Sequence, residues 1–444
     1  MRRSIRTRLA GSLAAIALAA AACGTPAGSS PATSPGASGP AASGGGYDGP
    51  PTTIEYAIWG DPAEQKSQSA IVDDFRAANP NIDVDVTVSD WDGYWAKLLT
   101  VVSGGAAPDV FAMDGPIGPD WQKRDVLLDL TPLIAADGFD LGQLYANAVK
   151  QFTTRDGKNF GLPRDLNATA LYYNKAMFDA AGIQYPDDTW DWDKLVEVGK
   201  KLTLDKDLDG TVDQWGLYTE TTDMENAWGP FVWQAGGDIL NADGTAIALD
   251  KPESAAGLQF LQDLIWKHNV ASDPALSDAG GDLFENGRAA MEINGSWLVP
   301  THEAAGLDFG IAPVPKGPAG RASMVNATGA VIYKNSKSPE AAWELVKYLA
   351  SPAAQTKMMA LKASVPANKE ILSTTYPASF DGAQVFADAL SYAHLKPSFP
   401  GYEEFNTILQ GELDESVYNA PNKTAADAIA AVKDQLNEIL QANQ

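Results

Sequence analysis

The folded part of this chain alternates strands with helices from its first predicted element onward. Apolar alternation and helical spacing predict, in order, strand 53–59, helix 62–79, strand 82–88, helix 91–103 and strand 108–114. Strands and helices that alternate in this way build doubly wound, mainly parallel sheets. Ligands of such sheets collect at the carboxyl ends of the strands. The pattern therefore predicts an α/β fold that binds its ligand at this edge.

Polar and aromatic side chains stand where these predicted strands end. Trp59 closes the first strand, Asp61 and Glu64 follow it, and Asp114 closes the third strand. We predict that these four residues contact ligand. Asp61 and Glu64 also have the D-x-x-E spacing of a capping box, so helix capping is an equally good interpretation of both.

The length and charge of the chain limit its class. About 390 residues follow residue 51, which is too many for one ordinary core and indicates two lobes. The net charge of −25 argues against binding nucleic acid and against docking on anionic lipid head groups. After the N-terminal region, no stretch approaches the roughly 18 apolar residues that a transmembrane helix needs. We expect a monomer.

The N-terminal region has the order of an export signal. Four arginines within residues 2–8 precede an apolar run over residues 9–22, and the only cysteine of the chain, Cys23, follows. Residues 1–22 resemble a type II signal peptide, so Cys23 is the predicted lipidation site. Residues 24–51 contain mostly Gly, Ser, Ala, Pro and Thr and predict a flexible linker. We therefore expect an exported protein, anchored to the outer face of the cytoplasmic membrane; a plain secretory signal is the alternative.

Tryptophans are frequent in the middle of the chain, and two of them stand apart. Trp228 and Trp297 lie beside glycine and polar residues rather than within an apolar stripe. A flat indole suits the C–H face of a sugar ring, while nearby carboxylates and amides satisfy the ring's hydroxyls. We predict that both tryptophans stack on ligand. Packing in the core is the alternative for each.

Six segments of the chain form a recognisable combination. They are Ala107–Phe111, Gly161–Asn167, Ala170–Phe178, Gly287–Met291, Asn294–Trp297 and Ser338–Glu344. Together these segments resemble, in the same order, those of the family 1 extracellular solute-binding proteins, the sugar-binding subunits of ATP-driven importers. The resemblance extends from about residue 53 to the C-terminus.

This resemblance implies a periplasmic-binding-protein-like fold of two α/β lobes that close on ligand by hinge motion. The predicted lobes are residues 52–163 with 314–365 and residues 164–313 with 366–444. Three crossings between them are expected near Gly161–Asp165, Gly310–Lys316 and Ser364–Asn368. The resemblance also implies that the chain captures a carbohydrate, such as a neutral oligosaccharide, and delivers it to the permease of an ABC importer. Carried over residue by residue, it adds six ligand contacts: Asp165, Asn167, Asn326, Thr328, Lys396 and Tyr402.

Residues 205–213 form an acidic motif with the D-x-D-x-D-G spacing of a calcium loop. Alternate oxygen ligands converge on a hard cation there, and glycine permits the sharp turn. The predicted ligands are Asp205, Asp207, Asp209, Thr211 and Asp213. Position 12 of the loop is Gly216 instead of a bidentate glutamate, so Glu220 would have to complete the shell. An acidic turn without metal is the alternative, and no other cofactor is expected.

Signatures of catalysis are missing from the sequence. There is no G-x-S-x-G nucleophile elbow and no phosphate-binding loop, and the three histidines are scattered. We therefore expect a binding protein rather than an enzyme, with the ATPase on a separate chain. Two alternatives stay open: a secreted glycosidase, which also needs tryptophans and two acids, and a protein that reports its ligand to a membrane sensor.

Overall fold

The computed structural model describes residues 47–219, 223–274, 276, 282–362, 364–419 and 421–443. The chain divides into two compact units, residues 1–44 and 45–444, and every described residue belongs to the second. The predicted signal peptide and Cys23 lie outside the described residues. Among the helices of the described part, none has both the length and the apolar character needed to cross a bilayer.

The first five elements form where the sequence predicts them. They are β1 (Thr52–Trp59), α1 (Pro62–Ala78), β2 (Ile82–Ser89), α2 (Trp91–Ser103) and β3 (Val110–Asp114). β1 pairs in parallel with both β2 and β3, so the carboxyl ends of the three strands meet at one edge. Asp61 and Asp90 cap the helices that follow β1 and β2.

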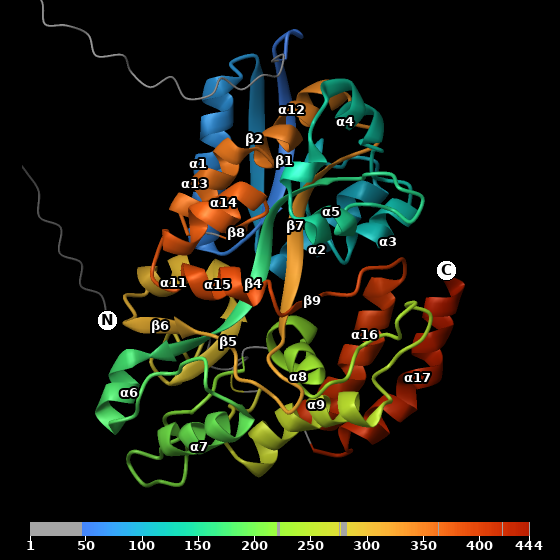
Figure 1. Cartoon of the computed structure of the whole chain (residues 1–444). Helices are drawn as coiled ribbons and strands as arrows, with labels where there is room; N and C mark the ends of the chain where they lie inside the picture. Colours follow the sequence, from blue (N-terminus) through green and yellow to red (C-terminus); the bar gives the residue numbers. More distant parts are fainter. Residues whose placement is uncertain are drawn as a thin grey trace, which may run out of the picture. The chain divides into compact units, whose positions relative to one another are not determined.

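The first lobe is completed by segments from two distant parts of the chain (Figure 1). One part contributes α3 (Gly118–Lys123), α4 (Thr131–Asp137), η1 (Leu141–Gln143) and α5 (Ala146–Gln151). The other contributes α12 (Pro339–Leu349), α13 (Pro352–Ala360), α14 (Lys369–Thr374), η5 (Tyr376–Ala378) and α15 (Ala383–Ala389). Their core is centred on the apolar residues of β1 and β3, among them Ile54, Tyr56, Val110 and Phe111.

The second lobe has a core of its own, which contains Phe178, Leu195, Leu258 and Leu436. Its helices are α6 (Lys175–Ala181), α7 (Trp192–Leu202), η2 (Met224–Trp228), α8 (Gly229–Gln234), α9 (Pro252–Gln262), η3 (Asp263–Lys267), η4 (Ser296–Leu298), α11 (Val299–Ala304), α16 (Tyr402–Leu413), η6 (Asp414–Tyr418) and α17 (Ala425–Ala442). Its strands are β5 (Met291–Gly295) and β6 (Phe309–Ala312).

Long strands pass between the lobes and join them. β4 (Leu162–Asn174) pairs antiparallel with β7 (Ser323–Ile332) and, further along, with β5 and β6. Two short strands, β8 (Val365–Pro366) and β9 (Ala393–Leu395), add to β4 and β7. The sheet order is β2-β1-β3-β7-β4-β5. The α/β class is confirmed. Between the labelled strands, parallel pairing occurs among β1–β3 and between β7 and β9, and the second lobe adds isolated parallel bridges such as Tyr218–Glu292.

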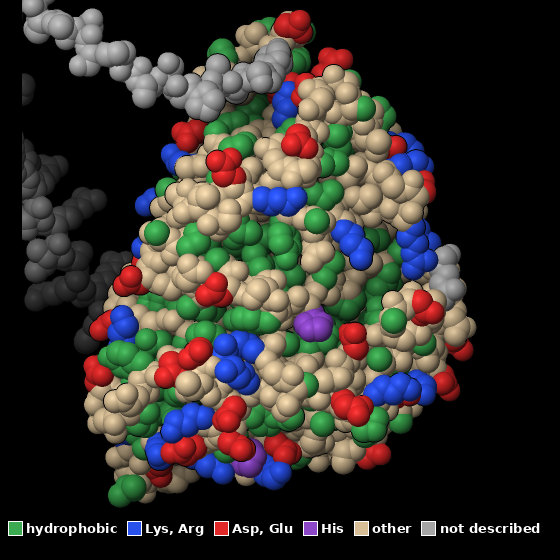
Figure 2. Space-filling model, viewed as in Figure 1, with side chains coloured by type: hydrophobic (Ala, Val, Ile, Leu, Met, Phe, Trp, Pro, Cys, Tyr) green, Lys and Arg blue, Asp and Glu red, His purple; other side chains and the backbone are tan. Residues whose placement is uncertain are grey.

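Two of the crossings differ from those expected near Gly310–Lys316 and Ser364–Asn368. Phe386 still packs in the first core and Phe399 in the second, so the third crossing lies between these residues and residues 366–389 belong to the first lobe. The second crossing also lies further along the chain. Gly310 and Ile311 pair with the far end of β4, and Val314 packs in the second core. The passage into the first lobe is made by β7, whose residue Val331 packs in the first core. The proline-rich stretch around 313–316 is therefore a turn within the second lobe. Figure 2 shows hydrophobic side chains gathered across the middle of this face of the molecule.

Candidate ligand-binding site

Asp114 lies at the carboxyl end of β3, where the sequence analysis places a ligand contact. Its side chain is buried, with 3% of the residue exposed. Asn326 Nδ2 on β7 donates a hydrogen bond to Asp114 Oδ1, and Lys396 Nζ lies 4.0 Å from Oδ2. Burial raises the pKa of Asp114 to about 6, although the positive charge of Lys396 opposes this. The site therefore holds a carboxylate that is ionised at neutral pH.

Lys396 joins Asp114 to a second acid from the other lobe. Its Nζ forms an ion pair with Glu225 Oε2 at 2.9 Å. Burial acts to lower the pKa of Lys396, but the negative charges of Glu225 and Asp114 outweigh it, and the pKa is raised well above its usual value. Tyr402 is buried beside this group, and burial raises its pKa. The result is an ammonium between two carboxylates.

Glu225 was not among the predicted contacts. It lies in η2, a short helix capped by Asp223, in a segment without apolar periodicity. Such a segment offers no local signal for the direction of one side chain. The only sequence feature that could have indicated Glu225 as a contact is its position three residues before Trp228.

A second buried polar group surrounds Asp165 on β4. Arg164 Nε donates to Asp165 Oδ2 at 3.1 Å, while Arg164 Nη1 donates to Gln68 Oε1 at 3.0 Å and to Tyr56 Oη at 3.2 Å. Arg164 and Asp165 are 5% and 3% exposed. Burial raises the pKa of Asp165, and Arg164 opposes that rise. Arg164 is a residue that the sequence analysis did not select, although it stands next to Asp165 in the same motif.

Asn167 and Thr328 connect the two crossing strands. Asn167 Nδ2 donates to Thr328 Oγ1 at 3.3 Å, and Thr328 lies opposite both Asp165 and Asp114 in the strand register. The predicted contacts on β3, β4 and β7 are therefore gathered around the junction of the lobes. Their role in binding stays a prediction.

Asp61 and Glu64 form the capping box at the start of α1. Asp61 Oδ1 accepts from the backbone N–H groups of Ala63 and Glu64, and Glu64 Oε2 accepts from the N–H of Asp61 at 2.9 Å. Burial raises the pKa of Glu64 to about 7. Capping uses only Oδ1 of Asp61. Its second oxygen, Oδ2, accepts a hydrogen bond from Thr301 Oγ1 on α11. Asp61 therefore links the first lobe to the second.

The three predicted tryptophans lie in different surroundings. Trp59 is partly exposed at the end of β1, and Trp297 is partly exposed in η4. Trp228 is 0% exposed in the second core, where its Nε1 donates to Gln410 Oε1 at 3.3 Å. An indole without an open face cannot stack on a sugar ring in this conformation. The stacking prediction for Trp228 is therefore replaced by its alternative, packing in the core.

Direct contacts close the two lobes against each other beside Asp114. Ser398 Oγ donates to the carbonyl of Gly115 at 3.1 Å. The carboxylate of Asp120 on α3 accepts from the backbone N–H groups of Gly401 and Glu403 at the start of α16. These contacts explain why the polar side chains of the site touch one another.

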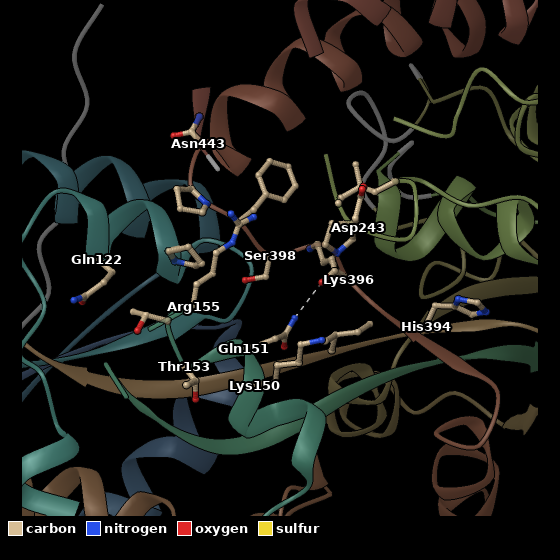
Figure 3. Close-up of a pocket in the computed structure, with 18 of the residues that line it drawn as sticks. Gln122, Lys150, Gln151, Thr153, Arg155, Asp243, His394, Lys396, Ser398 and Asn443 are labelled. Atoms are coloured by element: carbon tan, nitrogen blue, oxygen red, sulfur yellow. Dashed lines mark hydrogen bonds between the residues drawn. The ribbon is translucent and has the colours of Figure 1, made fainter. Parts of the chain in front are cut away.

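A groove of about 1120 Å³ lies on one side of this junction (Figure 3). Residues from α3, from α5 and from the turn after α5 line one part. Asp238, residues 240–244 and residues 394–400 line much of the rest. Figure 3 shows Gln151 directed at the Lys396 backbone, where its Nε2 donates to the carbonyl at 3.3 Å. Lys396 is the one predicted ligand contact among the residues that line the groove. Asp114, Glu225 and Asn326 do not line the groove, so in this arrangement the cluster lies behind it.

The acidic loop over residues 205–213 partly has the geometry that calcium needs. Oxygens of Asp205, Asp207 and Asp209 lie within 4.8 Å of one another. The loop also accepts backbone hydrogen bonds, such as Gly210 N to Asp205 Oδ2 at 2.9 Å, which an acidic turn without metal makes as well. Asp213 Oδ2 accepts from the N–H of Lys206, and Glu220 lies outside the described residues. The calcium site stays a prediction.

If the loop binds calcium, chelation lowers the melting temperature of the protein, because a ligand that binds only the folded state stabilises it. Asp207→Ala removes this sensitivity. Melting curves recorded with calcium and with chelator test the prediction. A wild-type curve that is the same in both conditions identifies the loop as a plain turn.

Known proteins share this fold and about a quarter of this sequence. Residues 54–356 match the family model described as bacterial extracellular solute-binding protein. The chain is 28% identical to an ABC substrate-binding protein of Listeria monocytogenes solved in complex with cycloalternan; the match covers 87% of this chain and 98% of that one, with a TM-score of 0.78.

Two further relatives extend this likeness. A solute-binding protein of an ABC transporter from Thermotoga lettingae, bound with α-D-tagatose, is 25% identical over 87% of this chain and 99% of that one, with a TM-score of 0.78. The maltotriose-binding protein of Pyrococcus abyssi is 25% identical over 390 residues, which cover 86% of this chain and 80% of the relative.

Proposed function

The chain belongs to the family of bacterial extracellular solute-binding proteins, and on that premise we propose that it captures a carbohydrate between its lobes and delivers it to an ABC import permease. Membership confirms the family expected from the six sequence segments. It also confirms that the protein is an exported binding protein and not an enzyme. The glycosidase alternative has no support from any of these relatives.

The cluster of Asp114, Glu225, Asn326 and Lys396 supports a carbohydrate ligand most directly. It brings two carboxylates, an amide and an ammonium together between the lobes. Sugar hydroxyls both donate and accept hydrogen bonds, so a mixed set of this kind suits them. One cation and two acids leave a net charge of −1, which disfavours an anionic ligand. Three relatives agree with a carbohydrate ligand. The proteins from Listeria and Thermotoga were solved with a bound saccharide, and the name of the protein from Pyrococcus contains one.

Binding requires the lobes to separate and close again. The crossing strands β4 and β7 carry Asp165, Asn167, Asn326 and Thr328, so hinge motion changes the distance of these residues from groups on either lobe. In the closed arrangement, Lys396 Nζ donates to Glu225 and lies 4.0 Å from Asp114 Oδ2, a buried oxygen that has no hydrogen-bond partner. A sugar hydroxyl that enters between Asp114 and Lys396 would accept from the ammonium and donate to the carboxylate, which gives Oδ2 the partner it lacks.

A thermal-shift screen against mono-, di- and oligosaccharides tests the proposal. A saccharide at about 100 times its dissociation constant adds roughly 2.7 kcal/mol of stability and raises the melting temperature. Time-dependent release of reducing ends from that saccharide would support the glycosidase alternative instead. Failure of every saccharide to shift the melting curve contradicts carbohydrate capture.

The membrane anchor is a separate part of the proposal. We infer that Cys23 is lipidated and holds the exported body at the membrane, where the permease lies. The placement of the chain's only cysteine directly after an apolar run supports this inference. Cys23→Ser should move the protein from the membrane fraction into the soluble exported fraction, as followed by fractionation and immunoblotting. Unchanged retention in the membrane fraction contradicts lipidation.

A further inference from the structure

Helix α16 of the second lobe begins without a capping side chain of its own. Gly401 occupies the N-cap position with a φ of 92°, and a glycine has no side-chain oxygen that could accept from the first N–H groups of the helix. Those groups have no acceptor within the helix, so they need one from elsewhere. Phe405 and Leu409 on the same helix are buried in the second core. The helix is therefore fixed in the second lobe, while its N-terminus depends on another part of the chain.

The acceptor comes from the first lobe. Asp120 on α3 accepts from Gly401 N with Oδ1 and from Glu403 N with Oδ2, the second at 2.9 Å. Glu403 is the second residue of α16, and its N–H is one that an N-cap side chain usually satisfies. A buried carboxylate at this position also suits the positive end of the helix dipole. Asp120 therefore caps a helix that belongs to the other lobe.

The first lobe holds α3 in place. Trp121, next to Asp120, is buried and packs against Phe111 on β3 with 5.9 Å between the ring centroids. The guanidinium of Arg124 lies 5.7 Å from the centre of the Trp121 ring and pairs with Glu403 at 2.9 Å. The two helices are thus anchored in different cores. Rotation of the lobes about the crossing strands changes the distance between them.

Other helices of the chain have caps that do not depend on the position of the lobes. Asp191 and Thr424 cap α7 and α17 from the position directly before each helix. A cap of this kind moves with its helix. The cap from Asp120 differs, because its two partners lie across the junction. Its contribution is therefore present only while the lobes lie together.

We propose that Asp120 is a positioning residue for closure, whose cap on α16 stabilises the closed lobes relative to the separated ones. Both oxygens of Asp120 are already used by Gly401 and Glu403, so the residue acts without contacting ligand. A ligand that binds the closed lobes gains affinity from this cap, because ligand and cap favour the same arrangement. The effect on affinity rests on the proposed function, whereas the effect on closure does not.

Fluorescence energy transfer between the lobes measures the contribution of the cap. The exported chain with Cys23→Ser carries one dye on each lobe through Asp73→Cys on α1 and Glu197→Cys on α7, two exposed positions. Single-molecule histograms recorded without ligand give the ratio of closed to separated lobes. Asp120→Ala is expected to lower this ratio by about three- to tenfold, the effect of losing one N-cap. Asp120→Asn, which keeps an acceptor, should lower the ratio less.

Asp191→Ala is the matched control, because it removes an acidic cap that lies within one lobe. Asp191 accepts from Lys194 N at 2.8 Å, and its loss should leave the ratio unchanged. An equal ratio in wild type and Asp120→Ala overturns the inference. An equal decrease in Asp191→Ala also overturns it, because the ratio would then follow helix stability in general. Should Asp120→Ala fail to fold, an unchanged ratio in Asp120→Asn contradicts the inference in its place.

The affinity for saccharides gives a second measurement. Calorimetry with the saccharides found by the thermal-shift screen should show a loss in Asp120→Ala that is no larger than the decrease of the ratio. The loss should be the same factor for each saccharide, because the cap does not contact the ligand. Factors that differ between saccharides overturn the positioning role. A wild-type protein that binds no saccharide contradicts the proposed function, and the energy-transfer measurement then decides the inference alone.

Discussion

Replacing Arg164 by leucine should lower the free energy of unfolding by about 3–5 kcal/mol, the usual cost of removing one partner of a buried ion pair. Arg164 Nε donates to Asp165, and Arg164 Nη1 donates to Gln68 and Tyr56. Without the guanidinium, the Asp165 carboxylate remains buried with its strongest partner removed. Chemical denaturation of wild type and variant measures the difference.

The controls for this prediction use another arginine and a second change. Arg124 forms an exposed ion pair with Glu403, with side-chain exposures of 45% and 36%. Arg124→Leu should therefore cost no more than about 1 kcal/mol. Adding Asp165→Ala to Arg164→Leu should recover part of the lost stability, because no unpaired charge is then buried. Equal effects of Arg164→Leu and Arg124→Leu would show that the buried network contributes little.

The pH dependence of the Arg164→Leu variant has a definite sign. Burial already raises the pKa of Asp165, and Arg164 holds that rise back. Loss of the arginine raises the folded-state pKa further above the unfolded value. A carboxyl with a raised folded pKa contributes most stability below its unfolded pKa, and that contribution is lost as pH rises through the folded pKa. The deficit of the variant should therefore shrink toward acid pH.

Asp114→Ala should weaken saccharide binding by ten- to a hundredfold, because a hydrogen bond to a charged group contributes about 1.5–3 kcal/mol. The carboxylate lies between Asn326 and Lys396 at the meeting point of the lobes. Isothermal calorimetry with the saccharide found by the thermal-shift screen measures the change. Asp83→Ala removes the same charge at the opposite end of the strands, from a side chain 71% exposed, and should leave affinity unchanged.

The same site should make binding depend on pH. The pKa of Asp114 is raised to about 6, so the carboxyl is ionised above that value and protonated below it. Affinity should therefore fall as pH decreases from 7 through about 6, because a protonated carboxyl loses its charge-assisted hydrogen bonds. Asp114→Asn, which cannot ionise, should flatten this part of the profile. A wild-type affinity that is constant between pH 7 and pH 5 speaks against a ligand contact at Asp114.

The sequence by itself determined the elements of the first lobe that depend on neighbouring residues. The bounds of α1 and α2 follow from helical periodicity together with caps at Asp61 and Asp90, all set within a few residues. Strand ends follow from the same local pattern, so Trp59 and Asp114 could be placed at the binding edge. The family could also be recognised, because its six segments are each local and occur in a fixed order.

Only the tertiary structure decided which side chains meet and which are covered. Trp228 has glycine and polar neighbours in the chain, yet it is buried, and Gln410, 182 residues away in sequence, hydrogen-bonds its indole. Lys396 meets Glu225 across 171 residues, and Asn326 meets Asp114 across 212. Local periodicity shows whether a residue lies on the apolar face of its own helix or strand. It contains no information on which distant element packs over that residue, because this depends on how the crossing strands bring the two lobes together.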